Sequence, residues 1–426
     1  TYYLALILLL IGMVYLIKAI KNGDIFNFLK RSGVLILAAL LASGTAITRL
    51  GTTMQYGKES TRGKSELTNN LDNKTSGLDK DYATSYSYGK LETFNLLYPN
   101  FKGGSSVGKL SEKSSVYKAL RTNGISKTDS KGFLEAVPLY FGPQQFTAGP
   151  VYIGATIFVL FFLGLFFLRD MIKWPLLIIL FISIFLSWGH NWMFLTKLFA
   201  NFFPGYSKFR SVTMILVIAE LILPLIGILW LFQFIEKKSD FLNKEVDLKF
   251  AKIENLNLFY ILCSIIILFF LSLVISPDLF LNFISQNEQQ IINQLSVMDP
   301  QTGSYVSELI DFRIGILSQD ALRSLILVSI VLLFLFLFIK NKISKHILIV
   351  SIGLTVMFDM WGVSKRYLNN NDHSDLETQL TRQSGLKYWK DYELKLYPHS
   401  PKPADLAIRD YEIALNNNLR IGVQNI

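Results

Sequence analysis

The sequence predicts an all-α polytopic membrane protein with about eight transmembrane helices and a large loop outside the cytoplasm. Of its 426 residues, 51% are hydrophobic and only 17% are charged, and a soluble domain needs a larger charged surface. The hydrophobic residues also come in blocks, as expected of a chain whose solvent is lipid rather than water. Several blocks approach the roughly 17–25 apolar residues that a helix needs to cross the hydrocarbon core.

Eight apolar runs mark the expected spans. In chain order they cover residues 2–17, 34–47, 151–168, 174–188, 212–235, 258–275, 322–339 and 347–361. Each run is expected to be helical because backbone polar groups cannot go unpaired in lipid. The shorter runs are expected to extend into their polar flanks.

The basic residues of the short connectors predict which side of the membrane each loop occupies. Lys and Arg concentrate in cytoplasmic loops. They follow the first, third and seventh runs, at Lys18, Lys21, Lys30, Arg31, Arg169, Lys173, Lys340, Lys342 and Lys345. The connector after the fifth run, residues 236–254, carries five lysines balanced by five acids. With eight spans all four connectors share one side, which is therefore predicted to be cytoplasmic.

Four regions follow from this topology. Residues 1–50 hold the first two spans, and residues 51–149 form an extracytoplasmic loop domain. Residues 150–361 hold six more spans, with external loops at 189–211 and 277–321, and residues 362–426 form a polar external tail. Aromatic residues such as Tyr86, Tyr88 and Phe101 indicate that the large loop is partly ordered. Because the chain opens at Thr1 directly before an apolar run, we expect it to be the later part of a longer protein.

Composition also argues against several functions. The formal net charge is +10, but the basic residues lie in connectors and one long loop, so nucleic-acid binding is not expected. The single cysteine, Cys263, cannot form an internal disulfide. The four histidines are scattered, so no zinc site is expected, and the need for another divalent metal stays open.

Two groups of external cations are candidate phosphate-binding residues. Lys58, Arg62 and Lys64 lie among hydroxyl side chains just beyond the second run, and such a group suits a phosphate or pyrophosphate headgroup. Lys208 and Arg210 lie in the external loop that follows Ser187-Trp-Gly-His-Asn191, against the trend for basic residues. An anionic lipid-linked substrate explains such cations, and ordinary contact with lipid headgroups is the alternative for both groups.

Four carboxylates are candidates for chemistry or for a buried polar role. Asp79, Asp81 and Glu92 are weak candidates for a catalytic base or a metal ligand near the membrane. Helix capping and surface charge are the alternative. Glu220 lies inside the fifth apolar run, where a carboxylate is costly and is either functional or paired. A structural role for Glu220 is as well supported as a functional one.

Several sequence runs together resemble the YfhO family of bacterial membrane proteins, most closely the versions from the Bacteroidetes group. The runs are Tyr56-Gly-Lys-Glu-Ser-Thr-Arg-Gly, Ser76-Gly-Leu-Asp-Lys-Asp-Tyr with Glu92-Thr-Phe-Asn-Leu, Gly149-Pro-Val-Tyr-Ile-Gly, Phe203-Pro-Gly-Tyr-Ser-Lys-Phe-Arg and Asp359-Met-Trp-Gly-Val-Ser-Lys-Arg-Tyr-Leu. The likeness covers most of the chain and thins beyond about Asp372. None of these runs is a general catalytic signature.

The resemblance implies a glycosyltransferase-like fold of the GT-C type in the bacterial inner membrane. Such enzymes take a sugar from a polyprenyl-phosphate carrier and pass it to an extracytoplasmic acceptor of the cell envelope, a glycan or a protein. Their catalytic acid lies in the first external loop near the N-terminus, so it is expected to precede Thr1. Arg62 and Arg210, helped by Lys208, would then stabilise the departing polyprenyl phosphate. The resemblance establishes no cofactor; it implies a polyprenyl-phosphate sugar as the donor substrate and membrane lipid as a partner.

Two other classes of function remain open. A lipid or polysaccharide transporter, such as a flippase, usually shows inverted repeats and a polar path, and neither is visible in the sequence. A non-catalytic envelope scaffold is the second alternative, because a fold alone does not determine function. A polymerase or ligase that uses the same carrier lipids would look nearly identical in sequence.

Overall fold

The computed structural model describes residues 2–60, 62–63, 75, 77–106, 112, 114–122, 124–136, 139–144, 146–203, 205–243, 245–248, 251–285, 288–290, 292–294 and 302–368. The chain divides into two compact units, Thr1–Val363 and Ser364–Ile426. Only residues 364–368 of the second unit are described, so the architecture below is that of the first.

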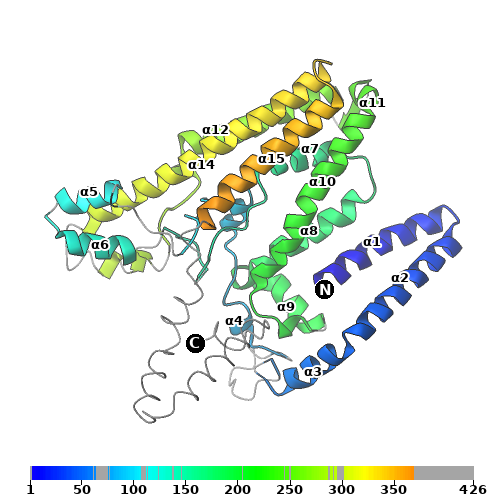
Figure 1. Ribbon diagram of the computed structural model, residues 1–426, viewed down its shortest axis with the longest axis horizontal. Helices are drawn as coiled ribbons and strands as arrows, with labels where there is room; N and C mark the ends of the chain where they lie inside the picture. The colour runs from blue at the N-terminus through cyan, green and yellow to red at the C-terminus, as the bar shows by residue number, and fades with distance from the viewer. Residues whose placement is uncertain are drawn as a thin grey trace, which may run out of the picture. The chain divides into compact units, whose positions relative to one another are not determined.

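The described chain is nearly all α-helical (Figure 1). Its longer helices are α1 Tyr2–Lys21, α2 Ile25–Thr45, α3 Ile47–Lys58, α7 Ala155–Phe167, α8 Lys173–Ser187, α9 Met193–Phe202, α10 Val217–Glu236, α12 Asn255–Ile275, α14 Thr302–Ile339 and α15 Lys345–Tyr367. A short antiparallel hairpin, β1 Glu245–Leu248 with β2 Ala251–Glu254, pairs Val246 with Ile253. The hairpin separates α12 from the short helix α11, Lys238–Asn243.

Among the described residues, five helical segments are long and apolar enough to cross a membrane. They are Ile25–Thr45, Val212–Glu236, Asn255–Ile275, Val306–Ile339 and Lys345–Tyr367. A sixth candidate is a broken pair, Lys173–Ser187 with Gly189–Phe202, which bends by 116°. The chain is therefore a helical membrane protein, but the expected eight spans are not confirmed. Helix α7 has 13 residues, which is about 20 Å at 1.5 Å per residue and shorter than a hydrocarbon core of about 30 Å.

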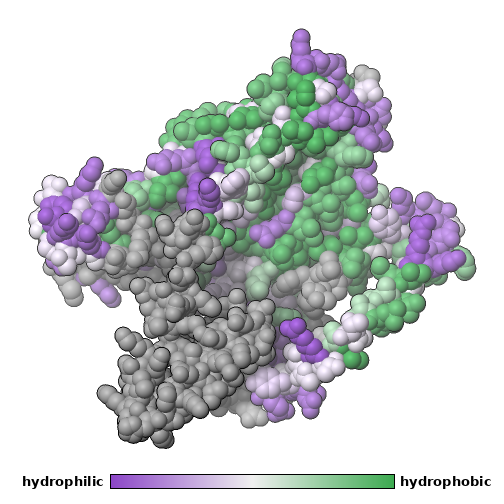
Figure 2. Space-filling model, in the orientation of Figure 1, coloured by the Kyte–Doolittle hydropathy of each residue, from purple (hydrophilic) through white to green (hydrophobic). Residues whose placement is uncertain are grey.

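One end of the helical bundle is rich in lysine and arginine. Here α7, α10 and α14 end and α8, α12 and α15 begin, and the basic residues are Arg169, Lys173, Lys237, Lys238, Lys340, Lys342 and Lys345. We call this the basic end and the opposite end the loop end. The ammonium of Lys238 donates to Phe338 O and to Asn341 Oδ1, the latter at 2.6 Å, so α11 is tied to the end of α14. Figure 2 shows a hydrophobic surface over α10 and α15, with hydrophilic side chains gathered at the tip that carries α11.

Helices α7 and α10 approach each other closely at two glycines. A Cβ on Gly164 would lie 3.1 Å from Ile226 Cγ2, and one on Gly227 would lie 2.9 Å from Leu160 Cβ. Small residues at facing positions allow helix backbones to pack tightly where no hydrophobic effect drives association. Helix α10 continues through Pro224, whose missing N–H removes one backbone hydrogen bond.

A buried ionic network joins α14, α15 and the segment before α7. Asp359 of α15 is fully buried, and its Oδ1 accepts from Arg323 Nη1 at 2.8 Å and from the Tyr152 hydroxyl at 2.7 Å. Arg323 Nη2 donates to the same Tyr152 hydroxyl at 3.1 Å. Asp320 lies one turn before Arg323 and accepts from the backbone N–H of Asn100 at 3.1 Å. This network therefore connects the spanning helices to the large loop.

The loop end contains the short helices α4 Lys80–Ala83, η1 Leu91–Leu96, α5 Ser115–Thr122 and α6 Lys127–Ala136. Of these, α5 and α6 pack on the first part of α14. Val116, Leu120 and Leu134 form a second hydrophobic cluster with Leu309 of α14. Helix α14 begins at Thr302, about 20 residues before the apolar run at 322, so the second half of the predicted loop 277–321 is helical.

Candidate functional site

The loop end contains a polar cavity of about 720 Å³. It lies beyond the ends of α8 and α12, and its walls come from five separate parts of the chain. The lining residues are Asp81, Thr84, Ser85, Lys102, Phe141, Gly142, Pro143, His190, Asn191, Ile284 and Ser285. A cavity with a carboxylate, an ammonium, an imidazole and several hydroxyls can bind a polar ligand such as a sugar phosphate.

One wall forms where the bend after α8 docks on residues 84–88. The backbone N–H of His190 donates to Ser87 Oγ at 2.9 Å, and Asn191 Nδ2 donates to Tyr88 O at 2.9 Å. His190 Nδ1 lies 3.2 Å from Thr84 O. In the tautomer that bonds this carbonyl, Nδ1 carries the proton and Nε2 is an acceptor. The close approach needs Gly189, because a Cβ there would lie 2.0 Å from Ser87 Oγ.

The opposite wall holds Lys102 against the ring of Phe141. The Lys102 ammonium lies 4.8 Å from the ring centroid, and the Phe141 N–H donates to Lys102 O at 3.0 Å. Burial lowers the pKa of Lys102 because desolvation penalises its charged form. The guanidinium of Arg313 lies 5.0 Å from the same ring and pairs with Glu288 at 2.6 Å. Phe141 is therefore flanked by two cations, of which Lys102 lines the cavity.

Glu92 is buried behind the cavity wall. Its Oε2 accepts from the Gly89 N–H at 2.9 Å, and its Oε1 accepts from the Tyr140 hydroxyl at 2.7 Å and from Gln144 Nε2 at 2.8 Å. Burial raises the pKa of Glu92, although these three hydrogen bonds oppose the shift. Glu92 is not among the residues that line the cavity. Glu92 therefore connects Gly89 to Tyr140 and Gln144 through its hydrogen bonds.

The two predicted aspartates lie on the segment that leads into the cavity. Asp81 is exposed and lines the cavity, so it is the predicted catalytic candidate that could reach a ligand there. Asp79 stands two residues earlier, at the N-cap position of α4. Its side chain makes no capping hydrogen bond to α4, so the helix-capping alternative is not confirmed for Asp79.

The predicted cations assemble on a surface next to this segment. Arg62 Nη1 donates to Lys208 O at 3.0 Å, and Lys208 Nζ donates to Arg62 O at 2.7 Å. Arg210 Nη1 donates to the Tyr82 hydroxyl at 3.0 Å, and its guanidinium stacks on Tyr82 and Tyr86 with ring distances of 4.4 and 5.1 Å. The structure thus brings Arg62, Lys208 and the Arg210 segment together across 146 residues of sequence.

None of the predicted cations that the structure describes is among the residues that line the cavity. Lys58 is exposed at the last residue of α3, and Lys64 lies outside the described residues. Glu220 lies in the first turn of α10 with an exposed side chain, so it faces outward from the bundle. Sequence reasoning missed Lys102 because a lone lysine beside Phe101 carries no motif. It also missed Arg323, the partner of Asp359.

Within the described part of the chain, no group of three or more His, Cys, Asp or Glu side chains is placed to hold a metal ion. Comparisons with protein-family models, with curated proteins and with solved structures return no match.

Proposed function

We propose that this protein is a membrane glycosyltransferase, which moves a sugar from a polyprenyl-phosphate carrier to an acceptor of the cell envelope. The observation that carries the proposal is the loop-end cavity of about 720 Å³, which combines Asp81 with Lys102 and His190. The loop end would face away from the cytoplasm, because the basic end fits the cytoplasmic side. The resemblance of the sequence to the YfhO family supports the same reaction.

The chemistry of sugar transfer needs the groups that this cavity contains. An acceptor hydroxyl gives its proton to a carboxylate while its oxygen attacks the anomeric carbon. The bond between that carbon and the phosphate oxygen breaks, and the polyprenyl phosphate leaves with the electron pair. Asp81 is the carboxylate on the cavity, and the Lys102 ammonium can stabilise the leaving phosphate. The carrier chain would remain in lipid beside the apolar helices.

Arg62, Lys208 and Arg210 would bind the carrier phosphate before the sugar enters the cavity. Arg210 is held by aromatic stacking on residues next to Asp81, and its guanidinium can still offer further donors to an oxyanion. In this role the three cations raise the local concentration of the anionic donor. Arg210→Ala should then increase the donor KM more than it lowers kcat.

The direct test is carrier release by the full-length protein incubated with candidate polyprenyl-phosphate sugars. Asp81→Asn should lower turnover by about 10²-fold or more if Asp81 is the acid–base group. Lys102→Met should weaken donor binding by about tenfold, the usual loss for one charge-assisted hydrogen bond. The matched control is Asp278→Asn, which removes an exposed loop-end carboxylate that does not line the cavity.

The possible outcomes separate three interpretations. Turnover lost in Asp81→Asn but kept in Asp278→Asn supports catalysis in this cavity. If Lys102→Met weakens donor binding but Asp81→Asn leaves turnover unchanged, the cavity binds the donor and another carboxylate has the acid–base role. Saturable donor binding without carrier release, in a protein whose melting temperature is normal, contradicts the transferase and supports the scaffold.

A further inference from the structure

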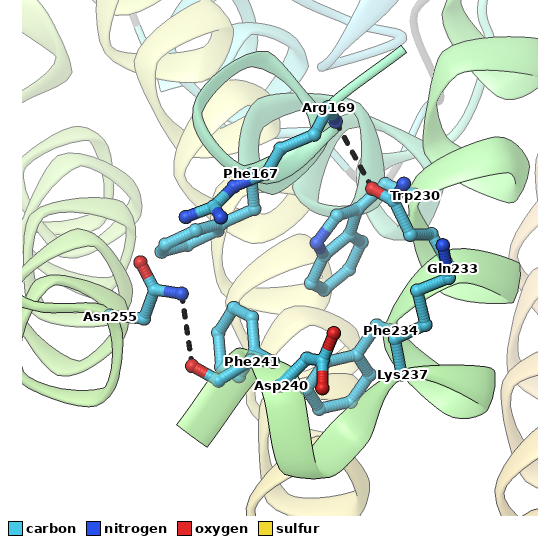
Figure 3. Close-up of a pocket in the computed structure, with 9 residues that line it drawn as sticks. All are labelled: Phe167, Arg169, Trp230, Gln233, Phe234, Lys237, Asp240, Phe241 and Asn255. Atoms are coloured by element: carbon cyan, nitrogen blue, oxygen red, sulfur yellow. Dashed lines mark hydrogen bonds between the residues drawn. The ribbon is translucent and has the colours of Figure 1, made fainter. Parts of the chain in front are cut away.

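A second cavity, of about 170 Å³, lies at the basic end, where α7 and α10 end and α12 begins (Figure 3). One water molecule needs roughly 10–15 Å³ of such space, so this cavity has room for a small polar group rather than a single water. Its walls are aromatic, and they belong to the main hydrophobic core. The aromatic wall residues are Phe167, Trp230, Phe234 and Phe241. This cavity shares no residue with the one at the loop end.

Two buried polar atoms of the cavity wall have no hydrogen-bond partner among the described residues: Trp230 Nε1 and Asn255 Oδ1. Trp230 is 1% exposed and Asn255 is 2% exposed, so neither atom is solvated at the surface. Figure 3 shows the indole nitrogen of Trp230 directed into the cavity from one side and Asn255 on the other. The Asn255 amide nitrogen already donates to Phe241 O at 2.9 Å, which fixes the orientation of its oxygen. A buried polar atom left unpaired lowers stability, and a bound group that pairs with it removes this loss.

Charged side chains form the rim of the same cavity. Arg169, Lys237 and Asp240 line it and are exposed. The backbone N–H of Arg169 donates to Gln233 Oε1 at 3.1 Å, which anchors Arg169 to α10. In Figure 3 its guanidinium extends across the cavity beside Phe167. The cavity therefore offers two cations and an indole N–H to an anion, and a carboxylate and an amide oxygen to a hydrogen-bond donor.

We propose that the basic-end cavity binds a phosphoethanolamine group. Its phosphate would accept from Arg169, Lys237 and the Trp230 N–H, and its ammonium would donate to Asn255 Oδ1 and to Asp240. Such a group occurs as the headgroup of a membrane lipid and as a free water-soluble compound. The position of the cavity at the end of the apolar helices, with aromatic walls and a polar rim, suits a headgroup at the membrane interface.

The test uses the full-length protein in detergent, titrated calorimetrically with three soluble probes. These are dihexanoyl-phosphatidylethanolamine, dihexanoyl-phosphatidylcholine, whose headgroup has the same phosphate but no N–H donor, and free phosphoethanolamine. Saturable binding of the ethanolamine lipid, about tenfold tighter than that of the choline lipid, is expected. Arg169→Gln and Trp230→Phe should each raise its Kd by about 5–20-fold, since each removes one donor to a charged group.

The control variant is Lys342→Gln, which removes an exposed cation of the basic end that does not line the cavity and should leave the Kd unchanged. Free phosphoethanolamine binding as tightly as the lipid supports the site and identifies a soluble ligand. Weaker binding of the free compound identifies the lipid. Equal binding of the choline lipid overturns the proposal, as does a Kd that does not respond to Arg169→Gln. Arg169 lies on the exposed rim of the cavity, so Arg169→Gln tests the proposed site even if Trp230→Phe fails to fold.

Discussion

At the scale of single residues, the ionic network around Asp359 shows how a charge is accommodated inside a helical bundle. Asp359 is fully buried, and Arg323, Tyr152 and Thr156 place donors within 3.4 Å of its carboxylate. A Cβ on Gly154 would lie 3.2 Å from Asp359 Oδ2, so the glycine keeps this space open for the carboxylate. Removing one partner of such a pair leaves the other charge buried and uncompensated.

The first prediction concerns this pair. Arg323→Met should lower the free energy of unfolding by about 3–5 kcal/mol, because it leaves both Asp359 and Asp320 without their guanidinium. Asp359→Asn should cost less, because Arg323 keeps Asp320 at 3.7 Å. The double variant should be more stable than the sum of the two losses predicts, as measured by denaturant unfolding in detergent. Strict additivity would show that the two side chains do not interact.

The second prediction concerns Glu92 and pH. Burial raises its folded-state pKa above the ordinary value of 4.5, so the protonated form is favoured in the folded protein. The stabilising contribution of Glu92 is therefore complete below the unfolded pKa and is lost as the pH rises through the raised folded pKa. The melting temperature of the protein minus that of Glu92→Gln should fall as the pH increases over this range. If this melting-temperature difference instead rises with pH, the folded-state pKa of Glu92 is lowered rather than raised, which contradicts the burial argument.

At the scale of elements, glycines with positive φ decide where loop segments can approach each other. Gly103 has φ +85°, and a Cβ there would lie 2.0 Å from Leu139 O. This approach positions Lys102 and Phe141 as one wall of the loop-end cavity. Gly124 has a nearly identical φ of +83° but nothing within 4 Å of its Cβ position.

Gly103 and Gly124 give the third prediction, because they share a backbone conformation and differ only in what surrounds their Cβ positions. Gly124→Ala should cost only about 1–2 kcal/mol, the strain of a left-handed L-residue. Gly103→Ala should cost about 2 kcal/mol more, because the backbone of residue 139 must also shift. Melting temperatures of the two variants measure the difference. Equal losses would mean that the close approach at Leu139 is not maintained in solution.

Hydropathy located most elements but not their ends. The apolar run at 258–275 forms α12, Asn255–Ile275, because a helix pairs its backbone polar groups internally, as a segment in lipid must. Hydropathy did not predict the start of α14 because residues 302–321 carry charged residues such as Glu308, Asp311 and Arg313. These residues form the first half of the helix, and the apolar run that begins at 322 forms the second half. The bend after α8 depends on Gly189, at φ +46°, and hydropathy contains no information on backbone torsion.

The candidate site was predictable only where its residues are neighbours in sequence. Asp81 and the cations at 62 and 208–210 were identified because charged residues cluster there. Lys102 and His190 face the same cavity through contacts between distant segments, and no local pattern records such contacts. The unpaired atoms of Trp230 and Asn255 were equally invisible, because being unpaired is a property of the packed structure.

At the scale of the whole molecule, the bundle has a basic end and a loop end, and this polarity predicts its orientation. With Cys263 replaced by Ser, single cysteines at Lys118 on α5 and at Lys342 on the α14–α15 turn would report on the two ends, and both positions are exposed. A membrane-impermeant maleimide should label position 118 in intact cells and position 342 only after permeabilisation. Labelling of both positions from outside would contradict the assignment of the basic end to the cytoplasm.

The length of α14 has a mechanical consequence. Its 38 residues make one continuous rod, about 57 Å long at 1.5 Å per residue, which is nearly twice the thickness of a hydrocarbon core. The far part of this rod carries Leu309, on which α5 and α6 rest, and Arg313, which backs the wall of the polar cavity. Helices tilt to match the bilayer around them, and a tilt of about 10° moves the far end of such a rod by about 10 Å. Bilayer thickness would thereby change the tilt of α14 and, with it, the width of the polar cavity at the loop end.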